Sequence, residues 1–587
     1  MPRCLAHFRS TLVLLFLSWL TPVLASESVP LFHIDSPTHV GRILRVALTA
    51  DERHLVTAGF DHTVRLWETA SGRPVQRWVL PNGDDRIHAL ALSPDGEWLA
   101  VGGDVSSAGE GAVLVIALRT GQIVRALGRL HARVGSLAFS PDGSLLAIGF
   151  AGPREVTQSA VGDLAGLIAS AHVGGNAIET GLRIYRTTDW HEVFADPLSS
   201  GVVSDLAFGP GGRLAVGTQE APGLGQIAVY ANEGGRFLRV ARADIQRHSA
   251  SRLAWAADGH GLELAGSGIY SAADLAEQRG SMQLPEGQPL GIIRRASAGR
   301  YWLAASAETG GPGFLRVYDA GGLLALHHES RLPDAVINDL VAFADGRVAY
   351  VSDNGSVALL EANGTIRWRH AANAVALRTQ PDRLRVSTDG EWVSLPYEGR
   401  EGIQDTAFHL PSGRFSPVSA ISGWREPLTG RRGLNLLAWR NSANGSANGN
   451  YFPFKSRGER SLSATVHSAV DNFYYGSDAG RLYKATAGVP SGPRYPARQS
   501  LMMWVRQLGA DVVGINLIES RDIVIVATAD GLLRVIRGRD GVVLLTYYLQ
   551  PNERKWLAIA ENGYYDASTG GEDLGGWVVS QNAAQLP

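Results

Sequence analysis

Short runs of alternating apolar and polar residues follow one another along most of the chain. Near the N-terminus the runs ILRVALT (43–49), HLVTAG (54–59), TVRLWE (63–68) and PVQRWVL (74–80) are separated by turn-forming residues such as GFDH and ASGR. A period of two is typical of β-strands that bury one face. The pattern therefore predicts four short antiparallel strands within residues 39–78.

The same grouping recurs along the chain at a spacing of about forty residues. The turn SPDG at 93–96 returns at 140–143, where Pro, Asp and Gly each favour a tight turn. Further copies of the grouping lie at 86–127, 133–190, 202–218, 251–268, 336–367, 461–486 and 512–548. Four-stranded units at this spacing are typical of β-propeller blades. The sequence predicts an all-β fold built of such blades.

The length of the repeat region predicts two rings. Residues 30–550 hold roughly twelve units at the propeller period, and one ring takes about four to eight blades. We therefore expect tandem β-propellers: a first ring over 30–330, a second over 331–550, and a C-terminal joining segment over 551–587. Two insertions, 151–181 and 423–460, interrupt the blades. Loops above a rigid ring often bind ligands, and the alternative is a passive surface insertion.

The first unit contains His39, Thr57, Asp61 and Trp67, a set that resembles the structural hydrogen-bond residues of WD repeats, with Trp67-Glu68 in place of Trp-Asp. The resemblance implies that Asp61 holds His39 and that His39 reaches Thr57 and Trp67 across the blade. A buried His and a buried indole N–H each need a polar partner. The alternative is a catalytic His–Asp pair, but no nucleophile stands at a matching spacing.

Later units keep only parts of this set. We expect Asp353, Asp478 and Asp530 to be turn aspartates of their blades. The stretch EANGTIRW (361–368) resembles the ends of quinoprotein-type blades, so the fold class is WD-repeat or quinoprotein-like.

The first 25 residues read as a secretory signal peptide. Arg3 and Arg9 precede the apolar run TLVLLFLSWL (11–20), and VLA (23–25) gives a cleavage point near Ala25. The pattern predicts a periplasmic or secreted protein, and its mature part holds no cysteine because the only one is Cys4. The alternative is an uncleaved membrane anchor. No other segment is long and apolar enough to span a bilayer.

Charge and motifs exclude several function classes. The chain has 54 basic and 56 acidic residues, so no global field attracts nucleic acid. The sequence shows no metal-binding spacing, phosphate loop or GxSxG elbow. We therefore expect no cofactor, no nucleic-acid partner and no enzyme activity.

The stretch ENGYYDASTGGEDLGGW (561–577) carries the most specific motif of the chain. Together with the preceding Trp, it resembles the joining segment of a bacterial family in which WD-repeat propellers precede a caspase-like peptidase domain. The matching residues include Trp556, Gly563, Tyr564, Tyr565, Asp566 and Trp577. In that family the catalytic His and Cys lie beyond this segment, so the resemblance carries over only the non-catalytic half.

Three functional hypotheses follow. The first is an exported, non-catalytic scaffold that binds a protein or peptide partner, with the tail packed on the last blade and Tyr564, Tyr565 and Trp577 partly buried. The second is a quinoprotein-like or hydrolytic propeller enzyme. The third is the regulatory half of a split caspase-like peptidase system.

Overall fold

The computed structural model consists almost entirely of β-strands. In the part of the chain that it describes, the only helical elements are short 3-10 turns, η1 (Pro210–Gly212), η3 (Val418–Ala420), η4 (Glu519–Arg521) and η5 (Glu572–Leu574). The described residues are 30–34, 36, 38–80, 87–103, 113–127, 134–150, 181–198, 202–221, 224–246, 253–256, 259–264, 268–279, 290–295, 301–306, 313–319, 326–334, 336–370, 383–399, 402–428, 430–431, 434–435, 446–447, 450–451, 461–466, 472–477, 480–486 and 502–579.

Seven four-stranded antiparallel sheets form the N-terminal body, and each uses four consecutive strands. The first four sheets comprise β2 (Ile43–Leu48), β3 (His54–Gly59), β4 (Thr63–Glu68), β5 (Pro74–Val79); β6 (Ile87–Leu92), β7 (Trp98–Gly103), β8 (Val113–Ala117), β9 (Gln122–Leu127); β10 (Val134–Phe139), β11 (Leu145–Phe150), β12 (Gly181–Arg186), β13 (His191–Pro197); β14 (Val202–Phe208), β15 (Leu214–Ala221), β16 (Leu224–Glu233) and β17 (Arg236–Gln246). The other three comprise β18 (Leu253–Trp255), β19 (Gly261–Leu264), β20 (Gly268–Ser271), β21 (Glu277–Arg279); β22 (Leu290–Arg295), β23 (Tyr301–Ser306), β24 (Gly313–Asp319), β25 (Leu326–Leu332); β26 (Ile337–Ala342), β27 (Val348–Ser352), β28 (Val357–Leu360) and β29 (Ile366–His370).

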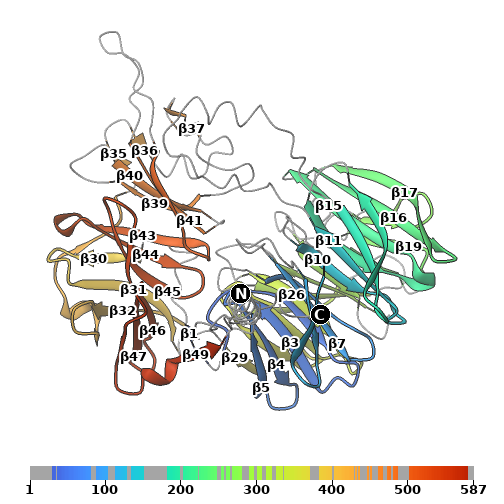
Figure 1. Ribbon diagram of the computed structural model, residues 1–587, viewed down its shortest axis with the longest axis horizontal. Helices are drawn as coiled ribbons and strands as arrows, with labels where there is room; N and C mark the ends of the chain where they lie inside the picture. The colour runs from blue at the N-terminus through green and yellow to red at the C-terminus, as the bar shows by residue number, and fades with distance from the viewer. Residues whose placement is uncertain are drawn as a thin grey trace, which may run out of the picture.

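These seven sheets close into one ring. The innermost strands contact one another in the order β2, β6, β10, β14, β18, β22, β26 and back to β2, and the blades radiate from this centre (Figure 1). Apolar side chains fill the spaces between neighbouring blades, for example Val56, Leu66, Leu90 and Leu99 between the first and second. The sheet of residues 337–370 packs against the first blade. The first ring therefore ends after residue 370, and the boundary expected near residue 330 falls one blade too early.

The first and last blades of the ring exchange no strand, so side chains hold them together. The amide of Asn338 donates to the Ile43 carbonyl at 2.8 Å, and the indole of Trp368 donates to the Thr69 carbonyl at 2.9 Å. Asp339 accepts the amide N–H of Val46 at 3.4 Å. The same device joins other blades: Ser136 accepts the amide of Leu206, and Asp205 accepts that of Leu253. An inner strand has backbone donors with no neighbouring strand, and these side chains satisfy them.

Three sheets of five, four and six strands form most of the described C-terminal body. Their strands are β30 (Arg385–Ser387), β31 (Trp392–Gly399), β32 (Gly402–His409), β33 (Arg414–Ser416), β34 (Trp424–Arg425); β39 (Ser461–Val466), β40 (Asn472–Ser477), β41 (Arg481–Thr486), β42 (Met502–Gln507); β43 (Val512–Ile518), β44 (Ile523–Thr528), β45 (Leu532–Arg537), β46 (Val543–Gln550), β47 (Lys555–Ala560) and β48 (Tyr565–Ala567). The hairpins β35 (Gly430–Arg431)–β36 (Leu434–Asn435) and β37 (Ser446–Ala447)–β38 (Asn450–Tyr451) lie between the first two sheets in sequence. Ten sheets of four or more strands are thus described, against about twelve expected.

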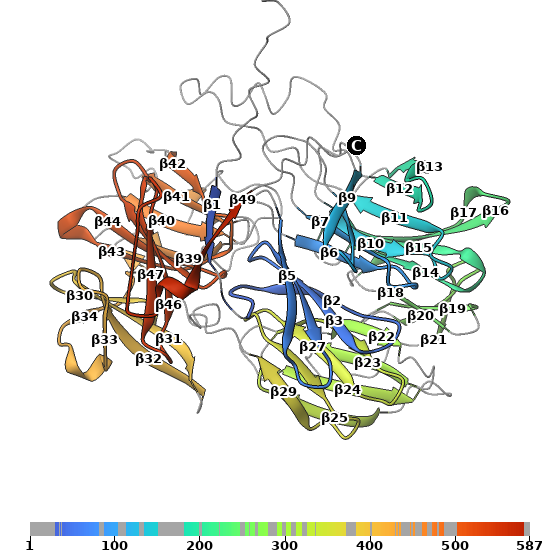
Figure 2. The same ribbon diagram turned by 60° about the horizontal axis from the view of Figure 1, so that its bottom comes forward.

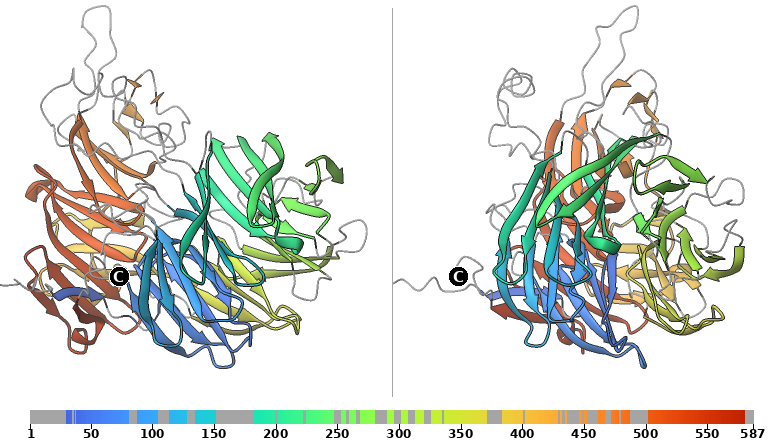
Figure 3. Two further views of the ribbon diagram at one scale, coloured as in Figure 1. Left: turned by 45° about the vertical axis from the view of Figure 1, so that its right-hand side comes forward. Right: turned by 90° about the vertical axis from the view of Figure 1, so that its right-hand side faces the viewer.

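The last sheet of the C-terminal body packs on both of the others. Its inner strand β43 contacts β39 and β30, and the amide of Asn516 donates to the Leu384 carbonyl at 2.8 Å, as Asn338 does in the first ring. Trp556 of β47 lies over Gly413, in the turn between β32 and β33. This contact brings a residue of the C-terminal motif into the packing between the last and first sheets of this body. The left view of Figure 3 shows this body, coloured yellow to red, beside the blue-to-green blades of the first ring.

The two ends of the described chain pair with each other. Strand β1 (Pro30–Ile34) is antiparallel to β49 (Gly575–Val579), with Phe32 opposite Trp577. This two-stranded ribbon lies where the two bodies meet (Figure 2). The sequence predicted a C-terminal joining segment but not its pairing with the N-terminus, because a pairing across some 540 residues leaves no local periodic signal.

We predict that Gly413→Ala destabilises the C-terminal body more than an equally strained substitution elsewhere. Gly413 has φ of +64°, and a Cβ there would lie 2.1 Å from the Trp556 indole. We expect a loss of roughly 1 kcal/mol from the left-handed backbone plus about 1–3 kcal/mol from overpacking. Gly211→Ala is the control, because Gly211 has φ of +74° with open space around it. Equal losses in denaturant unfolding would contradict the Trp556 contact.

Candidate functional site

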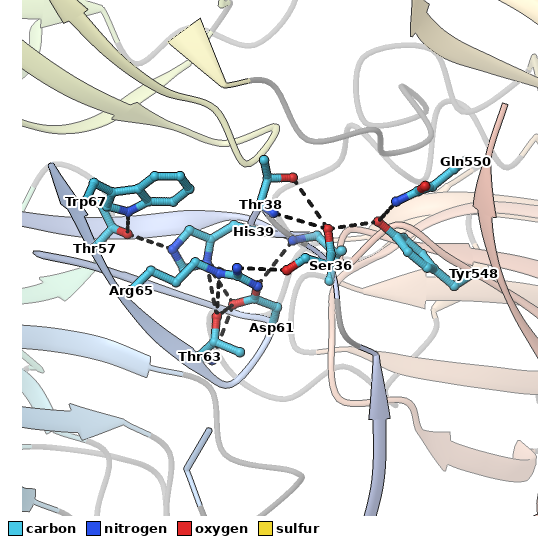
Figure 4. Close-up of polar contacts among 11 residues, drawn as sticks. Ser36, Thr38, His39, Thr57, Asp61, Thr63, Arg65, Trp67, Tyr548 and Gln550 are labelled. Carbon is cyan, nitrogen blue, oxygen red and sulfur yellow. Dashed lines mark hydrogen bonds and ion pairs between the residues drawn. The ribbon is translucent and has the colours of Figure 1, made fainter. Parts of the chain in front are cut away.

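A buried polar network in the first blade continues to the junction of the two bodies (Figure 4). Nδ1 of His39 lies 2.9 Å from Asp61, and Nε2 lies 2.7 Å from the Thr57 hydroxyl. The Trp67 indole N–H donates to the same hydroxyl at 2.7 Å. The structure thus brings together the four residues that resemble the WD-repeat set, with Trp67 bonded to Thr57 and not to His39.

The donors and acceptors of this network fix the protonation state of His39. An ionised carboxylate can only accept, so Nδ1–H of His39 donates to Asp61. Nε2 then accepts from the Thr57 hydroxyl, whose oxygen accepts the Trp67 N–H. Burial lowers the pKa of His39 below its ordinary value, and this outweighs the opposing effect of Asp61. The ring is therefore neutral and every polar atom of the chain of contacts has a partner.

Asp61 is the anion of the network. Burial alone would raise the pKa of its carboxyl, but His39, Arg65 and Thr63 together hold that pKa well below its usual range. The carboxylate also accepts the backbone N–H of Val40 at 3.1 Å and the hydroxyl of Thr63 at 2.9 Å. Asp61 therefore fixes both the side chain of His39 and the backbone beside it, which is a structural role.

The network reaches the C-terminal body through Arg65 and Ser36. Nη1 of Arg65 donates to the Ser36 carbonyl at 2.8 Å, and the Ser36 hydroxyl lies 3.3 Å from the hydroxyl of Tyr548 in β46. The Gln550 amide donates to Tyr548 at 3.2 Å. A hydrogen-bonded path therefore runs from Trp67 in the first blade to the last sheet of the other body (Figure 4).

Two of the three expected turn aspartates flank the same junction. Asp353 lies 2.5 Å from Nε of Arg42, and Asp530 accepts the Leu532 amide and the Arg534 guanidinium of β45, the strand that follows its turn. Asp353 thus has a longer-range partner than a turn role requires, whereas Asp530 fits that role. Asp478 and all but one residue of the insertion 151–181 lie outside the described residues, as do residues 1–25.

The centre of the first ring is a second polar site. A cavity of about 250 Å³ is lined by residues from all seven inner strands. Arg294 spans this centre: its guanidinium lies 3.0 Å from Asp339 and 3.8 Å from Asp205. Arg45 enters from the first blade and donates to the Gly135 carbonyl of the third at 3.3 Å. The two arginines therefore tie non-adjacent blades across the centre of the ring.

The tail motif divides into buried and exposed parts. Leu574 is buried with Val40, Tyr548 and Leu557, while residues 561–566, which form the β47–β48 turn and the start of β48, are exposed throughout. The Tyr564 side chain is 77% exposed and that of Tyr565 is 51% exposed. The expected partial burial is therefore wrong for Tyr564, which follows Gly563 (φ +84°) in the exposed turn between β47 and β48. Asp566 is exposed beside it and its carboxylate accepts the Ala567 amide.

Neither a metal-binding cluster nor a membrane-spanning helix is present among the residues that the structure describes. No group of three or more His, Cys, Asp or Glu side chains is placed to hold a metal ion in this part of the chain. None of the helical turns described above approaches the length or apolarity that a membrane crossing requires.

We predict that His39→Gln flattens the acid dependence of stability. The pKa of His39 is lowered in the folded state, so the unfolded chain binds more protons and stability falls as pH drops below 6.5, the ordinary histidine value. Glutamine has no titration, so unfolding free energy measured at pH 7.5, 6 and 5 should decline less steeply in the variant. Parallel pH profiles for both proteins would contradict a buried neutral His39.

We predict that Arg294→Met destabilises the first ring because it leaves Asp205 and Asp339 without their shared cation. Breaking a buried pair costs about 3–5 kcal/mol, and Arg294 is 26% exposed, so about 2–3 kcal/mol is expected. Adding Asp205→Asn and Asp339→Asn should restore most of the loss in the same unfolding assay. A triple variant weaker than the single one would contradict the charge argument.

The comparisons with known proteins agree with this geometry. The family model "WD domain, G-beta repeat" matches residues 32–68 and 74–104, which cover the His39 network and the start of the second blade. The ribosome biogenesis protein ERB1 of Meyerozyma guilliermondii is 32% identical over 100 residues, which span 16% of this chain and only 12% of that protein. The chain therefore contains WD40 repeats in a propeller of four-stranded blades.

Proposed function

We propose that this protein is an exported, non-catalytic WD-repeat scaffold that binds a protein or peptide partner, and that the hairpin of residues 561–566 forms part of the binding surface. One observation carries the proposal: two neighbouring tyrosines, Tyr564 at the end of the β47–β48 turn and Tyr565 at the start of β48, are exposed on a hairpin whose base is firmly packed. Tyrosine is enriched at interfaces because it is large, has few rotatable bonds and carries a polar tip.

The base of this hairpin gives it a fixed position. Trp556, the second residue of β47, packs against Gly413, Phe408 and Tyr547, and its amide donates to the Ser568 hydroxyl at 3.0 Å. Binding to an element that is already ordered costs less conformational entropy than binding to a loose segment. The exposed tyrosines are therefore held by an ordered, preorganised hairpin.

The other polar clusters support a scaffold over an enzyme. His39 and Asp61 use their hydrogen-bonding atoms within the blade, and Arg294 is engaged by two carboxylates. Both clusters hold elements of the fold together. Export is supported by the charged start, apolar run and small-residue cleavage point within residues 1–25.

A capture experiment with a matched variant tests the proposal. The mature protein and its Tyr564→Ser/Tyr565→Ser variant are immobilised and exposed to extract from the producing cell envelope, and retained proteins are quantified. We expect a specific protein to be retained by the wild type and lost, at least about tenfold, by the double variant. Ile366→Ser, which removes another exposed apolar side chain at 43% exposure, is the control and should retain it. Identical retained sets for all three proteins would overturn the role of the hairpin.

A further inference from the structure

Residues 36–42, called the joint segment below, precede β2 and lie between the two bodies. Pro37 lies outside the described residues. Ser36, His39 and Val40 are buried, although each belongs to a connecting stretch without regular structure. Loops usually run over the surface because buried backbone needs partners. A buried loop with both bodies around it therefore indicates a connection that both of them stabilise.

The first ring holds one side of the joint segment. Asp61 accepts the Val40 amide, and the Phe60 amide donates to the Arg42 carbonyl at 2.7 Å. Arg42 pairs with Asp353 of the last blade at 2.5 Å. The segment is thus fixed to the first and the last blade, at the seam where the ring closes.

The C-terminal body holds the other side through contacts of four kinds. Val40 packs with Tyr548, Leu557 and Leu574. Nη1 of Arg42 lies 3.8 Å from Asp511, which is fully buried, and the Ser36 hydroxyl lies beside that of Tyr548. Gly41 passes so close to Asp530 that a Cβ would lie 3.0 Å from its Cα. Charge, apolar packing and close backbone approach therefore coincide within three consecutive residues.

We propose that the joint segment locks the two propeller bodies into one rigid platform, with Arg42 bridging Asp353 of the first body and Asp511 of the second. Along the sequence, the described parts of the two bodies are joined through residues 371–382, which lie outside the described residues. The joint segment and the β1–β49 ribbon add a second, non-covalent link. The lock fixes the position of the 561–566 hairpin relative to the first ring. The lock itself does not depend on whether that hairpin binds a partner.

Cutting the covalent link tests the lock directly. A protease recognition sequence is inserted after residue 376, the purified full chain is cut, and size-exclusion chromatography follows the two fragments at falling concentration. The proposal predicts that the wild-type fragments stay together at low micromolar concentration. Wild-type fragments that separate after cutting would overturn it.

Variants identify the contacts responsible. Arg42→Ala removes the bridge between Asp353 and Asp511, and Val40→Asp places a charge against Tyr548, Leu557 and Leu574. Each should weaken association of the cut fragments at least about tenfold, as truncation of buried partners at interfaces does. Arg294→Met is the matched control, because it weakens the centre of the first ring without touching the joint segment. If the control separates the fragments as strongly as Arg42→Ala, general loss of stability explains the result and the lock is refuted.

A second experiment uses the intact chain, so it also applies to a variant that the protease does not cut completely. The mature chain has no cysteine, so Arg119→Cys and Arg539→Cys, both at exposed positions, accept one dye pair. Energy transfer between the two dyes is then measured on single molecules. The transfer efficiencies should form one narrow population in the wild-type background and a broader one with Val40→Asp. Equal widths in the two backgrounds would contradict the lock.

Discussion

The hydrogen bond between buried His39 and Asp61 is the contact on which the rest of the architecture depends. It joins the segment before the first strand to a tight turn two strands later. Asp61 can remain an anion without solvent because His39, Thr63, Arg65 and the Val40 amide all face it. A single carboxylate therefore positions the segment that both bodies contact.

Blade packing follows a second constraint, which is that the inner strand of each blade exposes backbone donors to its neighbour. Ser136, Asp205 and Asp339 satisfy these donors at three blade-to-blade steps. Where the ring closes without strand exchange, Asn338 and Trp368 add bonds to carbonyls of the first blade. Asn516 and Trp556 stand at the corresponding seam of the C-terminal body. In both bodies, therefore, an asparagine and a tryptophan connect the last sheet to the first.

Local pattern predicted the repeating unit well, and for a physical reason. Alternation, turn residues and the His39–Trp67 set all act within one blade of about forty residues. The boundary expected near residue 330 is one blade too early, because the sequence of a blade does not reveal which neighbouring blade it packs against. Trp368 and its acceptor Thr69 are some three hundred residues apart, and only the folded ring brings them together.

The C-terminal tail also shows that a local motif does not predict how its residues are placed in the fold. The motif around Tyr564 was visible in the sequence, yet its exposure depends on how β47 and β48 extend the last sheet. The sequence does not predict the pairing of β1 with β49 or the contacts of Arg42, because a single arginine between β1 and β2 gives no signal of two distant carboxylates. Function in a scaffold rests on such placement more than on any local motif.

Hydrogen–deuterium exchange at the joint segment tests the central claim most directly. If both bodies hold residues 38–42, the Val40 amide, which donates to Asp61, should exchange as slowly as amides of the buried strands β3 and β44 in the native protein. Exchange of that amide within seconds, while β3 and β44 stay protected, would contradict the account of a single platform joined by a buried segment.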